Sequence, residues 1–537
     1  MDTNVLYYGD NLDVLRKHIP DESVDLVYLD PPFNSSATYN VLFKEPSGKS
    51  SQAQMSAFED TWHWGLESEK ALQEIAASPI APAATKEFMS VLPNLVGKRT
   101  DMSAYITMMA VRLIELRRVL KDTGSLYLHC DPTASHYLKL LLDTIFGATN
   151  FRNEIVWKRT SAHSDSNRAG RVHDILLFYS KNEPVWNTVF QPYDDDYIQK
   201  YYRYKESDGR LYASGDVSAA GSGQAKYFNG VLRNPPTGTH WRFSQEKIDQ
   251  FVAEGRIFFT ENGFPRYKRY LDEMSGMPLQ DIWTDKEVQP VVSWSREGLG
   301  YRTQKPEALL ERIIKASSNE GDIVLDPFCG CGTAVVAAQN LHRKWIGIDV
   351  THLAIGLMKW RLKNLTPPAQ FTVVGEPTDL TGAQKLAEDD KYQFQWWAVA
   401  EVGGQPYGEK KKGADSGIDG YIYYMDEKDK IKKAIISVKG GHNANVSMIR
   451  DLAHVIDREK ADIGIFISID DPTRPMVEEA AMMGFYHSPL GRDYPRIQIL
   501  TIAQILDGKK PDVPQWVSPM PKSMTPKRDI SERPKLL

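Results

Sequence analysis

Residues 24–33 read VDLVYLDPPF, an apolar run that ends in an aspartate, two prolines and a phenylalanine. The run is short and rich in β-branched and aromatic residues, which predicts a buried strand followed by a stiff turn. Asp30 would then lie at the carboxyl end of a strand, where open α/β folds bind their ligands. The prolines donate no N–H, so the Pro31 carbonyl and the Asp30 carboxylate would present two fixed acceptors to an amino group. Phe33 would add an aromatic face. An ordinary strand-to-turn junction explains the same residues, and this stretch alone does not decide between the two interpretations.

Strands and helices alternate through the first part of the chain. Short apolar runs at residues 5–8 and 125–129 predict strands, and residues 12–19, 105–120 and 137–146 have the apolar spacing of helices. Asp10 follows the first of these strands, just as Asp30 follows its own. This alternation predicts a parallel α/β sheet.

Length and composition limit the classes of protein. A chain of 537 residues exceeds one ordinary core, so we expect two or three domains. It has no apolar stretch long enough to span a bilayer, and residues 1–4 lack the pattern of a signal peptide, so we expect no membrane association. Three cysteines argue against a disulfide scaffold and favour the reducing cytoplasm. The net charge of −5 means that nucleic-acid binding would need a local basic surface.

Basic and aromatic residues interleave between residues 183 and 295. Residues 201–205 read YYRYK and residues 266–270 read RYKRY, with Gly-rich and Pro-rich turns between them. We expect a loop-rich inserted module here, in which basic side chains hold phosphates and aromatic rings stack on bases. A solvated insertion whose tyrosines pack locally explains the same pattern, and both interpretations stay open.

A strand, a glycine turn and a helix follow one another from residue 323. Residues 323–333 read IVLDPFCGCGT, and the glycines would let the backbone approach a ligand closely. Residues 345–349 read WIGID, a second strand that ends in Asp349 at the spacing of an acid that binds a ribose. No Gly-Lys-Ser/Thr follows, which excludes a Walker phosphate loop. Cys329 and Cys331 adjoin no histidine cluster, so close packing explains them better than a metal site.

Together these motifs resemble the β class of S-adenosylmethionine-dependent DNA amino-methyltransferases. In that family a D-P-P-F/Y motif precedes an F-x-G-x-G motif, and a target-recognition region lies between them. The order here is the same, with TQKP at residues 303–306 before the glycine turn. Tyr301-Arg302 precedes TQKP where many members have His-Pro. The resemblance covers residues 4–365 and implies a Rossmann-like, doubly wound α/β sheet. In such a sheet the strand ending at Asp349 and the strand ending at Gly9 would be neighbours.

The resemblance also implies the chemistry, a methyl transfer from S-adenosylmethionine to an exocyclic amine of a base flipped out of double-stranded DNA. Asp30 and the Pro31 carbonyl would accept the two N–H hydrogens of that amine, within a turn stiffened by Pro32, and Phe33 would stack on the base. No covalent enzyme intermediate is implied. The resemblance implies that Asp10 binds the cofactor's adenine amino group and Asp349 its ribose. It also implies a methionine pocket of Lys305, Phe328, Gly330 and Gly332, and includes Asp326 and Thr333 among the cofactor-binding residues.

The acceptor atom is predicted from the first residue of the catalytic motif. In this family an aspartate before Pro-Pro usually accompanies adenine N6 and a serine cytosine N4, so Asp30 favours adenine N6. Cytosine N4, or RNA as the acceptor, stays open. A DNA-binding scaffold without activity is a further alternative, and the intact Asp30, Phe33, Gly330 and Asp349 argue against it.

The chain continues beyond the part that a methyltransferase requires. We expect the methyltransferase domain over residues 1–366 and a linker over residues 367–390. A smaller α/β domain would follow over residues 391–510, and a basic, Pro-rich tail over residues 511–537. A homodimer and a restriction or defence partner subunit are both open expectations.

The C-terminal domain resembles the Mrr-like branch of the PD-(D/E)xK restriction nucleases. Asp419 starts one predicted strand and Lys439 ends its hairpin partner, so both would lie at one end of a sheet. The resemblance implies that Asp419 binds Mg²⁺ and that Lys439 assists phosphodiester cleavage. Ser437 stands where that family usually has Glu or Gln, so either Glu401 completes the site or cleavage is impaired. A domain that only binds DNA or another chain stays open.

Overall fold

The structure, a computed structural model, describes residues 1–32, 38–44, 50–59, 64–97, 100–160, 169–291, 304–407, 417–427 and 430–514. Phe33 and most of the tail expected at residues 511–537 lie outside these ranges. The chain consists of two compact units. The larger comprises Met1–Asn187 and Asp281–Leu537, and the smaller is Thr188–Gln280.

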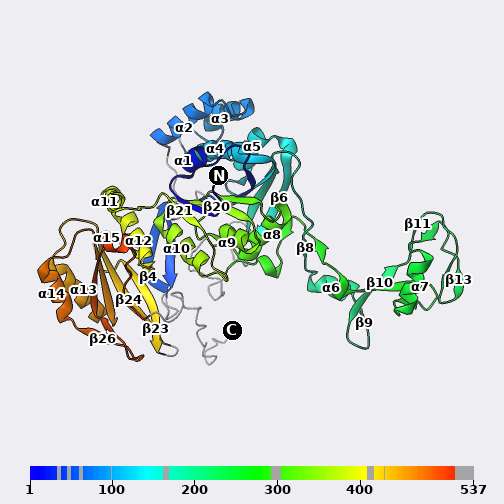
Figure 1. Ribbon diagram of the computed structural model, residues 1–537. Coiled ribbons are helices and arrows are strands. Elements are labelled where there is room, and N and C mark those ends of the chain that lie inside the picture. The colour runs from blue at the N-terminus through cyan, green and yellow to red at the C-terminus, as the bar shows by residue number, and fades with distance from the viewer. Residues whose placement is uncertain are drawn as a thin grey trace, which may run out of the picture. The chain divides into compact units, whose positions relative to one another are not determined.

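A nine-stranded sheet forms the centre of the larger unit (Figure 1). Its strands, in spatial order, are β18 (Ile282–Trp283), β6 (Phe151–Lys158), β7 (His173–Ser180), β5 (Leu120–Cys130), β2 (Val24–Leu29), β19 (Ile323–Asp326), β20 (Lys344–Asp349), β1 (Val5–Tyr8) and β21 (Thr372–Val374). Neighbouring strands run parallel, except that β7 is antiparallel to both β5 and β6. The predicted doubly wound α/β sheet is confirmed.

Strands from the two ends of the methyltransferase-like region lie side by side. β1 pairs with β20, with Tyr8 opposite Asp349, and the Gly9 amide donates to the Asp349 carbonyl at 2.9 Å. This confirms the predicted neighbours. β2 likewise pairs with β19 in parallel, which brings the end of β2 next to the end of β19, where the glycine turn starts.

Helices cover both faces of the sheet. The helices that accompany the main sheet are α1 (Asn11–His18), α2 (Leu66–Ala77), α3 (Ala83–Leu95), α4 (Asp101–Val119), α5 (Ser135–Phe146), α8 (Glu307–Ser317), α9 (Thr333–Asn340) and α10 (His352–Lys363). A hairpin of β3 (Thr38–Lys44) and β4 (Ser50–Glu59) stands apart from that sheet. Among the described residues, no helix is both long and apolar enough to cross a membrane.

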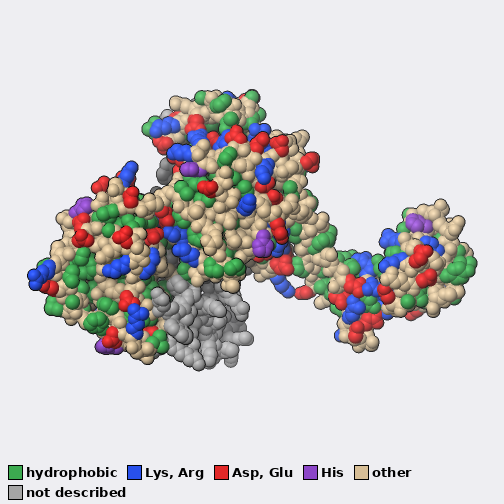
Figure 2. All heavy atoms as spheres, viewed as in Figure 1, with side chains coloured by type: hydrophobic (Ala, Val, Ile, Leu, Met, Phe, Trp, Pro, Cys, Tyr) green, Lys and Arg blue, Asp and Glu red, His purple; other side chains and the backbone are tan. Residues whose placement is uncertain are grey.

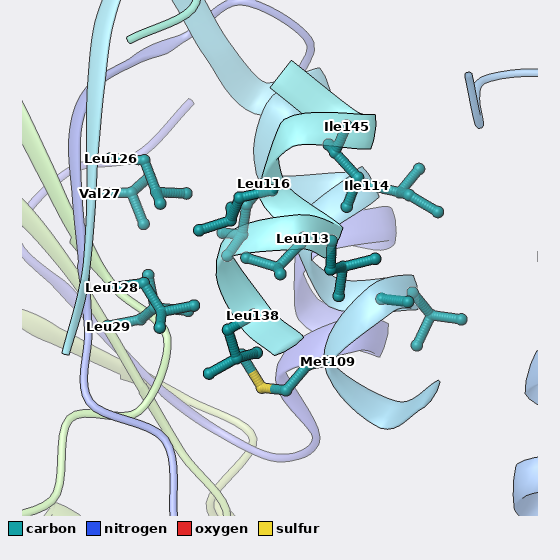
Figure 3. Packing of buried hydrophobic residues seen from close by; sticks show 14 of the residues in the cluster. Val27, Leu29, Met109, Leu113, Ile114, Leu116, Leu126, Leu128, Leu138 and Ile145 are labelled. Carbon is teal, nitrogen blue, oxygen red and sulfur yellow. The ribbon is translucent and has the colours of Figure 1, made fainter. Parts of the chain in front are cut away.

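Alternate side chains of β2 and β5 point to opposite faces of the sheet. On one face they pack against α4 and α5, as Figure 3 shows for Val27, Leu29, Leu126, Leu128, Met109, Leu113, Leu116, Leu138 and Ile145. On the other face lie Tyr28, Tyr127 and His129, and Tyr127 Oη is 2.7 Å from Ser317 Oγ at the end of α8. Both faces are buried, as expected for a largely parallel sheet.

The smaller unit has its own core and short strands. Its core comprises Val217, Phe228, Trp241 and Ile248. Its largest sheet has the order β15 (Ile257–Phe259), β16 (Pro265–Tyr270), β10 (Leu211–Asp216) and β9 (Tyr204–Lys205). Its remaining elements are the paired strands β11 (Ser218–Ala220) and β14 (Thr239–Trp241), β12 (Lys226–Phe228) and β13 (Val231–Arg233), β8 (Phe190–Gln191) and β17 (Met277–Pro278), and the helices α6 (Asp195–Tyr201) and α7 (Gln245–Ala253).

The boundaries of this unit are narrower than the insertion expected at residues 183–295. Residues 281–287 return to the larger unit, because β18 pairs with β6 in the main sheet. Asn187 is also held there, since its amide donates to the Ala316 carbonyl at 2.8 Å. Backbone hydrogen bonds to α8 and to β6 of the larger unit thus decide where the smaller unit begins and ends.

The C-terminal part contains a five-stranded sheet between two helical layers. Its order is β22 (Gln405–Pro406), β23 (Gly420–Glu427), β24 (Lys430–Lys439), β25 (Ile463–Ser468) and β28 (Ile497–Thr501). One core lies under α11 (Leu380–Asp389), α12 (Lys391–Glu401) and α15 (Ile502–Leu506). The other lies under α13 (Val446–Arg458) and α14 (Arg474–Met482), and β26 (Phe485–His487) pairs with β27 (Asp493–Pro495). This is the expected small α/β domain.

The structure differs from the linker expected at residues 367–390. β21 lies inside this range and forms the edge of the main sheet by pairing with β1. Helix α11 also lies there, and Ala383 and Ala387 bury its inner side against the C-terminal core. The polar composition concealed both elements, because each is short and gains its stability from packing against distant residues.

Candidate functional site

Four aspartates stand at the ends of neighbouring parallel strands. Asp30 follows β2, while Asp326 and Asp349 end β19 and β20, and Asp10 follows β1 by two residues. Because parallel strands end at the same edge of a sheet, these acids share the edge at which open α/β folds bind ligands.

Lys305 pairs with Asp30. Its ammonium group donates a hydrogen bond to Asp30 Oδ2, and both side chains are largely buried. Pro31, beside them, is buried as well. The resemblance had implied a place for Lys305 at the methionine pocket, whereas the structure places its charge on the acid expected to hold the target amine. This pair makes Asp30 a carboxylate with a fixed cationic partner.

The glycine turn between β19 and α9 is tied to Asp349. The Gly330 amide donates to Asp349 Oδ2 at 2.9 Å, and the Thr351 amide and hydroxyl both donate to Oδ1 at 2.9 Å. Gly332 has φ +76°, and a Cβ there would lie 2.5 Å from Met358 Cγ. Only glycine fits this position without displacing its neighbours.

The edge of the sheet holds closely spaced, buried carboxyl groups. Burial, reinforced by the carboxylates of Asp30 and Asp349, raises the pKa of Asp326 to about 8. Asp326 Oδ1 accepts a hydrogen bond from the Phe328 amide at 3.0 Å, which opposes that rise. Burial also raises the pKa of Asp349. Such a cluster favours a ligand that carries positive charge.

Asp10 has a structural role at this edge. Its Oδ1 caps α1 by accepting from the Leu12 amide at 2.8 Å, and its Oδ2 accepts from Arg112 at 2.7 Å. Next to it, Asn11 donates to the Pro327 carbonyl at 2.8 Å and so joins α1 to the glycine turn. The Asp10 side chain remains about half exposed, at 51%.

Two polar residues beside this edge were not predicted from the sequence. His129 at the end of β5 and Asp174 near the start of β7 are both buried, and they contact each other at 3.3 Å. The sequence did contain a signal for them, because each lies near the end of an otherwise apolar strand. His129 lies in SLYLHC (residues 125–130) and Asp174 in HDILLFYS (residues 173–180).

In the smaller unit, two of the basic residues among the tyrosines form ion pairs, and a third basic residue stacks on a tyrosine ring. Arg266 pairs with Asp216 and Lys268 with Glu206, and the Arg210 guanidinium lies 3.8 Å from the centre of the Tyr270 ring. On the face seen in Figure 2, basic and acidic side chains are intermixed over this unit. Local packing therefore accounts for these residues, and their contact with phosphates stays a prediction.

Asp419 and Lys439 lie on the paired strands of the C-terminal hairpin. Asp419 directly precedes β23, Lys439 ends β24, and Asp419 Oδ2 accepts a hydrogen bond from the Val438 amide at 2.6 Å. Glu401, expected to complete a Mg²⁺ site, is instead bound by Lys359 of α10 at 2.7 Å. The described residues contain no group of three His, Cys, Asp or Glu side chains that could hold a metal ion. The described part of the domain thus does not fit the expected Mg²⁺ ligand set.

Glu401 belongs to a cluster of charges around Lys359. Lys359 Nζ also contacts Glu376 at 2.8 Å, and Glu376 lies 3.5 Å from His352. His352 stacks on the Tyr8 ring at 3.6 Å, and its amide donates to Gln393 of α12 at 3.0 Å. Glu401 therefore serves the contact between α10 and α12.

Comparisons with known proteins agree with both parts of the chain. A family model described as DNA methylase matches residues 24–356, and one described as restriction endonuclease matches residues 398–485. The type II methyltransferase M.EcaI of Enterobacter cloacae is 37% identical over 254 residues, which cover 46% of this chain and 55% of that protein. The Mod subunit of the type III restriction-modification enzyme StyLTI of Salmonella typhimurium is 28% identical over 362 residues, 64% of this chain and 50% of that protein. The chain thus spans about half the length of these relatives.

A solved structure of the PvuII DNA methyltransferase, described as cytosine-N4-specific, is 13% identical and covers 68% of this chain and 89% of its own, with a TM-score of 0.33. The match of the first family model extends over more than half of the residues and contains the Asp30 motif, the glycine turn and Asp349. The chain belongs to the DNA methylase family, and a restriction-endonuclease-like domain follows its methylase domain.

Proposed function

We propose that this protein transfers a methyl group from S-adenosylmethionine to the N6 amino group of adenine in double-stranded DNA. The observation that carries the proposal is Asp30, which follows β2 at the edge shared with Asp326 and Asp349 and is oriented by Lys305. S-Adenosylmethionine, when bound, supplies an electrophilic methyl group on a positively charged sulfur.

The acidic edge of the sheet suits this cationic cofactor, because a nearby positive charge favours the ionised forms of Asp326 and Asp349. Asp349 already accepts three hydrogen bonds from Gly330 and Thr351. Because a carboxylate offers roughly four lone-pair sites, it retains capacity for a ribose hydroxyl. We assign the adenine amino group to Asp10, and the methionine end to the turn formed by Asp326, Phe328, Gly330, Gly332 and Thr333.

Asp30 would grip the target amine. An exocyclic amine is a poor nucleophile, because its lone pair is delocalised into the ring. Lys305 holds Asp30 Oδ2, so the amine would donate one hydrogen to Oδ1 and the other to the Pro31 carbonyl. Both acceptors are fixed before the base arrives, and positioning of this kind supplies most of the rate in such transfers.

The acceptor atom is tested directly by product analysis. Duplex DNA is incubated with the protein and labelled cofactor, digested, and the labelled nucleoside identified. We expect the label in N6-methyl-2′-deoxyadenosine. An Asp30→Ala variant should transfer no label. Label only in N4-methyldeoxycytidine would make cytosine N4 the acceptor. A parallel incubation with RNA tests the polymer, and label in RNA but not in DNA would make RNA the substrate.

The C-terminal domain has a second candidate function, the recognition of DNA phosphodiesters at Asp419 and Lys439. Its match to a restriction endonuclease family and the fixed position of Asp419 beside Val438 favour this assignment. Cleavage is assayed on duplex DNA with and without Mg²⁺. Cutting that is lost in Asp419→Ala and Lys439→Ala would establish a nuclease, whereas intact DNA with every protein would leave a binding domain.

The protein would act together with a partner chain. StyLTI is named as a Mod subunit, and we propose that a restriction subunit or a second copy of the chain accompanies this protein as well. Sedimentation of the purified protein with duplex DNA would distinguish a monomer from a dimer.

A further inference from the structure

A row of buried polar side chains crosses three neighbouring strands of the main sheet. Tyr28 Oη lies 3.0 Å from His129 Nδ1, and His129 Nε2 lies 3.3 Å from Asp174 Oδ2. These residues come from β2, β5 and β7, which are adjacent in the sheet, and they are 3%, 0% and 1% exposed. The row is a continuous hydrogen-bonded path within the core.

The donors and acceptors of this path follow from the charge of Asp174. Burial opposes ionisation, but the hydrogen bond from His129 and the charges of Lys305 and Arg159 hold the pKa of Asp174 below its usual value. Asp174 is therefore a carboxylate, which only accepts, so His129 Nε2 donates to it. With Nε2 carrying the one hydrogen of a neutral ring, Nδ1 would accept a hydrogen bond from the Tyr28 hydroxyl.

Packing holds each member in place. The Trp157 ring meets the edge of His129 at 5.4 Å, and Trp157 Nε1 donates to the Val288 carbonyl at 2.8 Å. Arg159 Nε lies 3.4 Å from Asp174 Oδ1 and is 44% exposed. The path thus runs from a partly exposed arginine to a fully enclosed tyrosine.

Tyr28 connects the path to the site. It lies in β2 two residues before Asp30, which directly follows the strand. Alternation continued by one residue beyond β2 would place the two side chains on the same face. In register, Tyr28 lies opposite Tyr127 of β5 on one side, and β19, which ends at Asp326, pairs with β2 on the other. Because its hydroxyl is hydrogen-bonded, Tyr28 holds the end of β2 in place directly before the Asp30 motif.

We infer that Tyr28, His129 and Asp174 are positioning residues for the Asp30 carboxylate during methyl transfer. The inference rests on the proposed function. Stability alone does not require this arrangement, because burying a carboxylate and an imidazole in a core costs more than filling the space with apolar side chains. Tyr127, the residue of β5 that lies opposite Tyr28, shows that a buried tyrosine needs no such path. Its hydroxyl forms a hydrogen bond with Ser317.

The test compares two equally buried tyrosines. Tyr28→Phe and Asp174→Asn are measured beside the control Tyr127→Phe, which removes a buried hydroxyl from the same sheet face. Single-turnover methyl transfer to duplex DNA, the Kd of S-adenosylmethionine and the Tm are determined for each. We expect Tyr28→Phe and Asp174→Asn to slow transfer about tenfold to a hundredfold, because small displacements of a catalytic group cost that much. Cofactor binding should stay within about twofold, and Tyr127→Phe should transfer at nearly the wild-type rate.

The double variant shows whether the residues act through one another. If they form one path, Tyr28→Phe combined with Asp174→Asn is no slower than the slower single variant. The inference would be overturned if Tyr28→Phe and Tyr127→Phe slowed methyl transfer equally, or if neither Tyr28→Phe nor Asp174→Asn changed the rate. Either result would leave the proposed function standing. An inactive wild type would overturn the proposed function and this inference with it. Tyr28→Phe removes only a hydroxyl, so it decides the test if Asp174→Asn does not fold.

Discussion

The Lys305 ammonium group and the Asp30 carboxylate form a hydrogen bond between residues that are 275 positions apart in the chain. Lys305 immediately precedes Pro306 at the start of α8, and Asp30 follows β2. The pair is enclosed, with side-chain exposures of 9% and 17%, so each charge depends on the other for stabilisation. In the proposed reaction, a target amine would therefore share Asp30 with the Lys305 ammonium group.

This pair should be strongly coupled. We expect Asp30→Asn and Lys305→Met each to destabilise the fold, and the double variant to be more stable than the sum of the two losses predicts, by about 1–3 kcal/mol. Denaturant unfolding of the four proteins measures this coupling. The exposed pair of Lys17 and Asp13 on α1 is the matched control, with an expected coupling of about 0.3–0.5 kcal/mol. Equal coupling for both pairs would show that Lys305 and Asp30 are not associated in solution.

Asp326 should make stability depend on pH. Its pKa is raised from 3.8 to about 8, so between these values the folded protein keeps a proton that the unfolded chain releases. The contribution of Asp326 to the free energy of unfolding therefore falls as pH rises, by about 1.4 kcal/mol per pH unit, and levels off above the folded pKa. Asp326→Asn should remove this slope, and so gain stability relative to wild type between about pH 5 and pH 8. Unfolding curves at several pH values test this, with Asp13→Asn as an exposed control. Parallel curves for wild type and Asp326→Asn would contradict it.

The smaller unit should be dispensable for cofactor binding but not for DNA methylation. The first and last segments of this unit already lie together, because β8 pairs with β17 and the Leu279 backbone amide donates to the Val189 carbonyl at 2.9 Å. Replacing residues 192–276 by a short Gly-Ser linker should leave S-adenosylmethionine binding within about twofold, since the strand-end acids all lie in the larger unit. Methyl transfer to DNA should be lost. A shortened protein that methylates at the wild-type rate would refute a target-binding role for this unit.

The charge cluster at Lys359 should stabilise the contact of α10 with α12. Lys359→Met would leave Glu376 and Glu401 without their shared cation, and we expect a loss of about 3 kcal/mol or a fall of several degrees in Tm. The control is Arg474→Met, which breaks the exposed pair with Glu478 and should change stability by about 0.5 kcal/mol or less. Equal Tm values for the two variants would exclude a stabilising role for the cluster.

Glu401 marks where the sequence-based prediction of the C-terminal site differs from the structure. Glu401 lies upstream of Asp419 and was expected to replace the acidic ligand that is missing at Ser437. In the folded chain its carboxylate faces Lys359, and Lys510 donates to its backbone carbonyl at 2.5 Å. The spacing of residues in the sequence does not determine which basic side chain an acidic residue will pair with in the folded protein.

The sequence by itself determined the α/β sheet, its order of motifs and the acids Asp30, Asp326 and Asp349 at the strand ends. These are local properties, because strand periodicity, proline turns and glycine turns act over a few residues. Only the tertiary structure decided that Lys305 binds Asp30, that His129 and Asp174 support Tyr28, and that β21 and α11 occupy the expected linker. These contacts join residues far apart in the chain. They depend on which strands become neighbours and on the burial of charges that must then find partners, and no short stretch of sequence contains that information.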